Sequence, residues 1–205
     1  MATNVYKTYK STFKNAILIS IISTFLVSST IFIHNSTKNK ILYQTEKENK
    51  KLMDQVIPKK LFNTVNKKLY WVKNTLLGDH EYHDLWLFFD KKCPKFAVIK
   101  SIAPDGYSGS IHMLISSDFN GKIIRVRILS HKETPGIGDK IELSVSDWIN
   151  CFSGLTIKSL KDKQLSLRKY GGKIDQFTGA TITPQAVTNA VKRTVFFVKK
   201  IPFMF

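Results

Sequence analysis

The chain has 205 residues, 43% of them hydrophobic, which is enough for one globular domain with an additional segment. Lys and Arg number 32 against 15 acidic residues, giving a formal net charge of +17. The cations are spread along the whole chain, a usage that an AT-rich coding sequence also produces. No basic stripe interleaves with aromatic residues and no zinc-ligand spacing occurs, so the composition argues against a nucleic-acid partner.

The two cysteines, Cys93 and Cys151, form no C-x-x-C motif, so we expect neither a disulfide framework nor a metal site. A single bridge is possible if the domain lies outside the cytoplasm, but two buried free thiols is the favoured interpretation. His80 and His83 have no third ligand at a suitable spacing. We therefore interpret them as exposed or core histidines.

An uncharged apolar run, AILISIISTFLVSSTIFI, occupies residues 16–33 after a polar N-terminus with three lysines. As a helix this run would span about 27 Å, close to the hydrocarbon thickness of a bilayer. A cleaved signal peptide is the alternative, but the run is long and no small-residue cleavage site follows. We predict a cytoplasmic N-terminus over 1–15 and one transmembrane helix over 16–34. Lysines lie on both sides, and a short basic end inside with the domain outside is the simplest orientation.

Residues 35–58 are charged but keep apolar positions at helical spacing, which predicts a helical stalk that Pro58 ends. The domain would then occupy residues 59–205. Its first part, 59–90, is ambiguous, although the apolar run Leu85–Phe89 favours a buried strand.

Antiparallel strands are predicted next. Phe96–Ile102 has the composition of a strand, and two further strands flank Asp118-Phe119-Asn120-Gly121. Asn-Gly between alternating apolar segments, here Ser110–Ser116 and Lys122–Leu129, is a strong hairpin signal. Alternation in the second strand predicts which side chains face the core and which face away: Ile124, Val126 and Ile128 against Arg125 and Arg127.

That strand leads directly into His131-Lys132-Glu133-Thr134-Pro135-Gly136-Ile137-Gly138-Asp139. One proline and two glycines specify a tight loop whose backbone can lie close to a flat ligand, with an ordinary rigid loop as the alternative. Further along, Asp147–Phe152 has the pattern of a short amphipathic segment, and Trp148 within it is predicted to be a core residue.

The stretch with the most chemistry is Phe177-Thr178-Gly179-Ala180-Thr181-Ile182-Thr183-Pro184. Its two small residues allow a bulky group to approach the backbone, and its three threonines offer hydroxyl groups. Thr183 followed by Pro184 predicts a helix N-cap and first helical residue, and apolar spacing continues the helix until Pro202.

The N-terminal end of a helix carries partial positive charge and free N–H groups, so it favours an anion and phosphate above all. The residues alone therefore predict a phosphate site with a nucleophilic threonine. A simple capped turn is the common alternative for such a pattern.

The string Asp175-x-x-Thr178-Gly179-Ala180-Thr181 resembles the acceptor motif of flavin transferases, D-x-x-(S/T)-G-A-(T/S). In proteins with this motif the last hydroxyl residue carries FMN through a phosphoester bond. The resemblance implies that Thr181 is that residue and that a separate transferase attaches FMN from FAD. It also implies that Asp175 is read by the transferase rather than acting as a base within this chain.

Several strings taken in order resemble the G subunit of the Rnf-type ion-translocating electron transport complex. They are an N-terminal anchor, Gln55-Val56-Ile57-Pro58, Gly106-Tyr107-Ser108-Gly109, the His131–Gly138 loop and the flavin-acceptor motif. The match runs over nearly the whole chain, although residues 60–95 contain no family-specific string. The C subunit of the sodium-pumping NADH:quinone reductase shares the FMN-binding domain but is usually longer, so length favours the Rnf family.

The resemblance implies an α+β fold: a periplasmic FMN-binding domain with an antiparallel sheet and a C-terminal helix, held by one inner-membrane helix. Electrons would pass between this chain and the membrane and iron–sulfur subunits of the same complex, coupled elsewhere to cation movement. FMN would do the redox chemistry, and no catalytic or metal-ligating residue is expected in the chain. Residues implied to hold it are Thr181, Thr178, Gly179, Ala180, Glu133, Thr134 and Gly136.

Two other hypotheses belong to different classes. One is a membrane-anchored assembly or binding subunit without flavin, against which the intact acceptor motif argues. The other is a basic anchored protein that binds anionic lipid, which salt-sensitive lipid binding without a chromophore would support.

Overall fold

The structure is a computed structural model that describes residues 2–57, 66–90, 93–160 and 162–201. It divides into two units, residues 1–48 and residues 49–205. The described residues of the first unit, 2–48, all belong to one long helix, α1 (Ala2–Val56), whose last turns are part of the second unit. Pro58 and Pro202, predicted to end helices, lie outside the described residues.

Helix α1 is continuous through the predicted N-terminus, span and stalk. Its apolar side chains between Ile17 and Ile33 are largely exposed, and by length and composition it could cross a membrane. Exposed apolar side chains in such a run are what contact with lipid tails requires. Three threonines of the helix, Thr24, Thr30 and Thr37, donate their hydroxyls to backbone carbonyls four residues earlier, which satisfies these polar groups within the helix.

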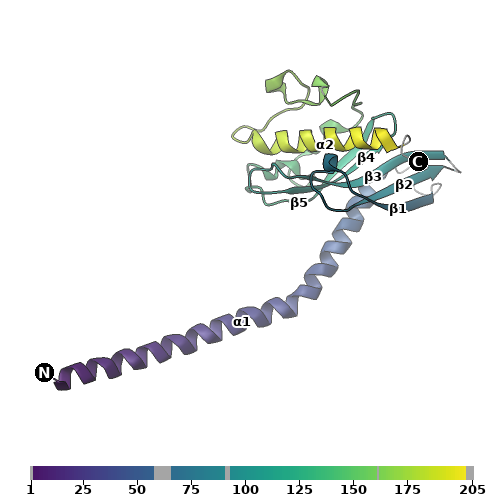
Figure 1. The fold of residues 1–205 in the computed structure, drawn as a ribbon. Helices are drawn as coiled ribbons and strands as arrows, with labels where there is room; N and C mark the ends of the chain where they lie inside the picture. Colours follow the sequence, from purple (N-terminus) through teal and green to yellow (C-terminus); the bar gives the residue numbers. More distant parts are fainter. Residues whose placement is uncertain (1, 58–65, 91–92, 161, 202–205) are drawn as a thin grey trace. The chain divides into compact units, whose positions relative to one another are not determined.

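The second unit is built on a five-stranded antiparallel sheet with strands in sequence order. The strands are β1 (Asn66–Val72), β2 (His83–Asp90), β3 (Cys93–Ala103), β4 (Ile111–Asp118) and β5 (Ile123–Ser130). Helix α2 (Ile182–Lys200) lies along one face of this sheet (Figure 1). The predicted α+β class, antiparallel sheet and C-terminal helix are thereby confirmed.

The two faces of the sheet are covered differently. Between the sheet and α2 lies the main core, to which every strand and the loops after β5 contribute. On the opposite face a smaller cluster forms around the stacked rings of Phe88 and Phe96. Val56, the last residue of α1, and Ile57 directly after it also belong to this cluster. The stalk end is therefore part of the folded domain.

The hairpin between β4 and β5 forms as predicted. Asp118 Oδ1 accepts from the N–H groups of Asn120 and Lys122, and Gly121 has a φ of +87°, a value at which glycine is favoured. The predicted facing of Ile124 is wrong. A register shift beside Ser116 leaves Ile124 without a cross-strand partner, and it packs against the smaller cluster on the outer face.

The cysteine prediction is half right. Cys93 and Cys151 are free thiols, but both are exposed rather than buried. His83 is a buried histidine whose Nε2 lies 2.7 Å from Asp79 Oδ1. Short 3₁₀ turns occupy the long connection from β5 to α2, at Asp139–Ile141 (η3), Asp147–Phe152 (η4), Lys163–Leu165 (η5) and Arg168–Tyr170 (η6).

Candidate functional site

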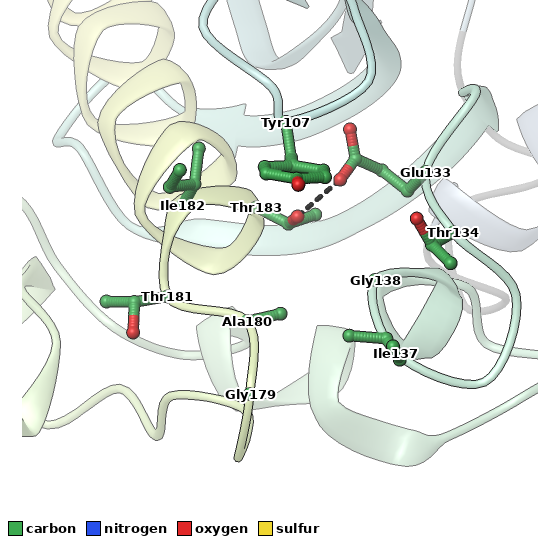
Figure 2. A pocket seen from close by; sticks show the side chains of 10 residues that line it. All are labelled: Tyr107, Glu133, Thr134, Ile137, Gly138, Gly179, Ala180, Thr181, Ile182 and Thr183. Carbon is green, nitrogen blue, oxygen red and sulfur yellow. Dashed lines mark hydrogen bonds between the residues drawn. The ribbon is translucent and has the colours of Figure 1, made fainter.

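A cavity of about 360 Å³ lies where the β3–β4 loop, the loop after β5 and the start of α2 meet. Figure 2 shows its lining side chains, which are mostly small or apolar and include one acid. The residues are Tyr107, Glu133, Thr134, Ile137, Gly138, Gly179, Ala180, Thr181, Ile182 and Thr183.

Glu133 is the structural centre of this cavity. Only 4% of it is exposed, and its carboxylate accepts hydrogen bonds from the β3–β4 loop and from the first turn of α2. Ser108 N–H donates to Oε1 at 3.0 Å, and the Thr183 hydroxyl, 50 residues further along the chain, donates to Oε2. A buried carboxylate needs such donors, because a carboxylate that is removed from water without hydrogen-bond donors strongly destabilises the folded state. Glu133 thus ties the β3–β4 loop and α2 to its own loop.

Two glycines make room for this carboxylate. A Cβ atom on Gly138 would lie 2.9 Å from Glu133 Cβ and 3.0 Å from Oε2. On Gly106 it would lie 3.0 Å from Oε1 and 2.2 Å from the Gly109 carbonyl oxygen. Neither position has space for a larger residue, which explains why glycines stand on both sides of Glu133.

The loop after β5 is held by its own backbone and by His131. The N–H groups of Ile137 and Gly138 donate to the Thr134 carbonyl, and Gly136 has a φ of +79°. Glu133 N–H donates to His131 Nδ1 at 3.0 Å. His131 Nε2 therefore carries the ring proton in the neutral ring, and it donates to Glu142 at 2.8 Å.

The opposite wall is the threonine-rich segment. Phe177 to Ala180 form a four-residue turn closed by Ala180 N–H donating to the Phe177 carbonyl at 3.2 Å. Gly179 occupies the third position with a φ of +83°, and a Cβ there would contact nothing within 4 Å. The turn directs the chain into α2 while leaving its outer side open.

Helix α2 begins two residues earlier than predicted, and the prediction of Thr183 as its N-cap is wrong. Thr181 holds the cap position with no side-chain capping bond, and Ile182 is the first helical residue. Thr183 is not a cap because its hydroxyl is taken by Glu133. Pro184 remains within the first turn, where its missing N–H is not needed.

The first turn of α2 has the properties of an anion site. It contains no acidic residue. Within the described chain, Gln185 is the residue of this turn that donates back to the cap, to the Thr181 carbonyl at 3.2 Å. The earlier N–H groups of Ile182 and Thr183 have no intrahelical acceptor, as at the start of any helix. The Thr181 side chain is half-buried and points away from Ala180 and Ile137 in Figure 2.

Upstream, the segment is held by a tryptophan and an arginine. Trp148 Nε1 donates to the Asp175 carbonyl at 2.7 Å, and the indole makes edge contacts with the rings of Phe177 and Phe152. Trp148 was predicted to be a core residue, and in the structure it is half-buried and packs against the main core. The Asp175 carboxylate, 61% exposed, pairs with Arg168 Nε at 2.7 Å.

The structure brings together most of the predicted binding residues. Thr181, Gly179, Ala180, Glu133 and Thr134 line the cavity. The other three predicted residues are exposed and do not line it: Thr178, Gly136 and Asp175.

Three apolar residues of the cavity were not predicted as site residues. Tyr107 is 69% exposed, and Ile137 and Ile182 are also exposed although they are large and apolar. Tyr107 stood within a family string, but a lone exposed isoleucine carries no sequence signal of its own. Their common position at one cavity becomes visible only when the three segments are folded together.

Comparison with known proteins identifies the family to which the chain belongs. The sequence profile described as "FMN-binding domain" matches residues 106–195, the stretch that contains every residue lining the cavity. The G subunit of the ion-translocating oxidoreductase complex from Buchnera aphidicola subsp. Schizaphis graminum is 56% identical over 199 residues, covering 97% of this chain and 98% of the relative. The chain belongs to the family of G subunits of ion-translocating oxidoreductase complexes.

More distant members agree. The G subunit from Photorhabdus laumondii is 44% identical over 190 residues, covering 92% of this chain and 91% of the relative. That of Escherichia coli O157:H7 is 41% identical over 190 residues and covers 92% of both chains. The family resemblance inferred from the His131–Gly138 loop and the threonine motif is confirmed.

Proposed function

We propose that this chain is a membrane-anchored flavoprotein subunit that passes electrons through FMN held covalently on Thr181. When bound, FMN supplies the redox chemistry by accepting and releasing electrons. The chain supplies attachment, orientation and a protected surface for the ring. The observation that carries the proposal is the position of Thr181, which is the N-cap residue of α2 and also lines the cavity.

Thr181 suits a phosphoester for electrostatic and steric reasons. A phosphate on its hydroxyl would lie beside the N–H groups that begin α2, where the helix dipole favours negative charge and no acidic residue of the first turn opposes it. Ala180 and Gly179 precede it with almost no side-chain bulk. The Thr181 hydroxyl makes no capping hydrogen bond, so its modification would break no such bond.

The cavity also fits a flat, largely apolar ring. Tyr107, Ile137 and Ile182 offer exposed apolar surface that a bound ring would cover. Glu133 is the acid in the lining, and its two oxygens are already engaged by Ser108 and Thr183. It therefore holds the walls in place and does not present a free carboxylate to an anionic cofactor.

Attachment itself would be performed by a flavin transferase. With FAD as donor, the phosphoanhydride bond between FMN and AMP breaks, a bond between Thr181 Oγ1 and the FMN phosphorus forms, and AMP leaves. The hydroxyl proton goes to a base on the transferase. Asp175 and Thr178 are exposed on the same segment, where a second protein could read them.

In-gel flavin fluorescence tests the attachment. The chain is co-expressed with a flavin transferase, denatured and run beside Thr181→Ala, Thr181→Ser and Thr134→Ala. We expect fluorescence on wild type and Thr181→Ser, none on Thr181→Ala, and fluorescence on Thr134→Ala, a matched threonine of the same cavity. A dark wild-type band beside a fluorescent control acceptor would overturn the proposal and favour a non-redox assembly subunit. Fluorescence that survives in Thr181→Ala would place the flavin elsewhere.

We further propose that α1 crosses the bacterial inner membrane once, with residues 59–205 on the periplasmic side beside membrane and iron–sulfur subunits of the same complex. The exposed thiols Cys93 and Cys151 permit a direct test. A thiol reagent that cannot cross the inner membrane should label Cys93 in intact cells, whereas desolvation raises the pKa of the Cys151 thiol to about 12 and should slow its labelling. Cys93→Ser/Cys151→Ser should remain unlabelled. Labelling only after the inner membrane is permeabilised would reverse the orientation.

A further inference from the structure

The proposed function gives no role to the end of the stalk, where Gln55, Val56 and Ile57 stand. Val56 and Ile57 are buried against the outer face of the sheet, and they complete the smaller hydrophobic cluster. Apolar burial alone would hold this end in place. Gln55, by contrast, is exposed overall, yet both its backbone carbonyl and its side-chain oxygen accept bonds from β5.

Two arginines of β5 make these bonds. Arg125 donates from a terminal nitrogen to the Gln55 carbonyl at 2.6 Å. The last carbonyls of a helix lack intrahelical partners and carry partial negative charge, so a guanidinium is a favourable partner for them. The last turn of α1 contains no basic residue of its own, and Arg125 supplies that charge from the sheet.

Arg127 is the more unusual of the two, because only 6% of it is exposed. Its Nε donates to Gln55 Oε1 at 2.9 Å, and a terminal nitrogen donates to the Val126 carbonyl and to Asn150 Oδ1, at 2.7 and 3.2 Å. No carboxylate of the described chain pairs with it. Burial lowers the pKa of its guanidinium, and the charge of Arg125 lowers that pKa further.

A buried guanidinium that is held by neutral oxygens depends on every one of them. Each acceptor that is removed leaves a desolvated N–H of a charged group, which is among the costliest defects in a folded protein. Gln55 and Asn150 come from the stalk end and from η4, so Arg127 joins these two elements across the edge of the sheet.

The connection continues into the acceptor segment. The turn η4 carries Asn150 together with Trp148, whose indole bonds to the Asp175 carbonyl and contacts the Phe177 ring. A series of hydrogen bonds, linked through the backbone of η4 between Asn150 and Trp148, thus runs from Gln55 through Arg127 to the segment that precedes Thr181. Such a series carries coupling only if a change at one end alters the other, which is measurable.

We propose that Gln55, Arg127 and Asn150 form a stalk clamp that makes the order of the acceptor segment 174–180 depend on the docked end of α1. Arg127 is its central positioning residue and acts on Thr181 through η4. The clamp ties the flavin-bearing wall to the stalk end. The structural part of this inference stands without flavin, and only its effect on loading rests on the proposed function.

Hydrogen exchange of the full-length chain in detergent micelles tests the structural part. We expect Gln55→Ala to speed amide exchange in residues 147–152 and 174–180 by about tenfold, as loss of one bond to a charged group would allow. Exchange in β3 and β4 should not change. Gln44→Ala, the same substitution at an exposed position earlier in α1, is the matched control and should have no effect in either region.

Rescue and coupling sharpen the result. Gln55→Glu retains an acceptor for Arg127 and should restore slow exchange. In an Asn150→Ala background the additional Gln55→Ala change should no longer affect residues 174–180, because the contact series is already interrupted. Additive effects of the two substitutions would overturn the proposal. So would a change confined to residues 49–57 and β5, or an equal rise throughout β3 and β4, which would indicate global destabilisation.

The effect on function is read separately, as the rate at which purified flavin transferase loads the chain with FMN. We expect Gln55→Ala to slow loading several-fold while the final level reached is unchanged, and Gln55→Glu to load at the wild-type rate. If wild type itself takes no flavin, the proposed function fails while the exchange result still decides the clamp. Normal loading by Gln55→Ala, with faster exchange in 174–180, would overturn the functional part alone.

Discussion

The two walls of the cavity are built in opposite ways. The loop from Glu133 to Gly138 is fixed by long-range contacts, with a buried carboxylate bonded to residues 25 and 50 positions away. The segment from Asp175 to Thr181 is mostly exposed and is shaped by a local turn, one indole bond and one surface ion pair. The first wall leaves no space for an added methyl group at Gly138, and the second leaves open space at Gly179.

This difference matches two different requirements. A cavity that orients a rigid ring needs walls that are set before the ring arrives, and buried hydrogen bonds provide that order. A side chain that another enzyme modifies must be reachable, so its segment has to lie at the surface. We infer that the Glu133 wall orients the flavin and that the Asp175–Thr181 wall presents the site of attachment.

The same substitution in the two walls separates these roles. Gly138→Ala places a Cβ against the Glu133 side chain, and we expect it to lower the free energy of unfolding by about 1–3 kcal/mol. Gly179→Ala meets no atom and costs only the left-handed backbone, about 1 kcal/mol. Flavin loading should follow the reverse order, with Gly179→Ala the poorer acceptor. Denaturant unfolding and in-gel fluorescence measure the two effects.

Thr134→Ala is the control for Gly138→Ala, because it changes the same loop at an exposed side chain and should leave stability unchanged. Equal losses of stability in both glycine variants would contradict the distinction between the walls. Poorer flavin loading by Gly138→Ala than by Gly179→Ala would do so as well.

A smaller effect on stability is expected at Asp175. Asp175→Asn breaks an exposed ion pair, so the free energy of unfolding should change by less than about 1 kcal/mol. Flavin loading should nevertheless be lost, because the transferase would no longer find the carboxylate. Arg168→Ala breaks the same ion pair but keeps Asp175, and it should load normally. Loss of loading in Arg168→Ala alone would show that the ion pair, rather than the carboxylate, is what matters.

Local signals made much of the fold predictable. The Asn120-Gly121 turn was predictable because Gly121 adopts a positive φ that few other residues tolerate. The facing of Ile124 was not, because it depends on a register shift opposite Ser116 that no local pattern encodes. Strand β1 was also missed, since its lysines interrupt the alternation that identifies a strand.

The candidate site shows the same division. Its acceptor segment was predictable as a motif because five residues within a span of seven carry it. The N-cap residue of α2 was not predictable, since the hydroxyl of Thr183 is bound by Glu133 from a distant part of the chain. Exposure of the cysteines, the clustering of Tyr107, Ile137 and Ile182 and the burial of Arg127 likewise result from tertiary packing.

The most direct test of the central claim is mass spectrometry of the peptide that carries Thr181. Trypsin should release residues 174–192, because Lys173 and Lys192 flank a stretch without Lys or Arg. After co-expression with a flavin transferase, we predict that this peptide gains the mass of FMN less one water and that fragmentation assigns the gain to Thr181. An unmodified peptide from protein that a control shows to be loading-competent, or a gain assigned to Thr178, Thr183 or Thr188, would contradict the account.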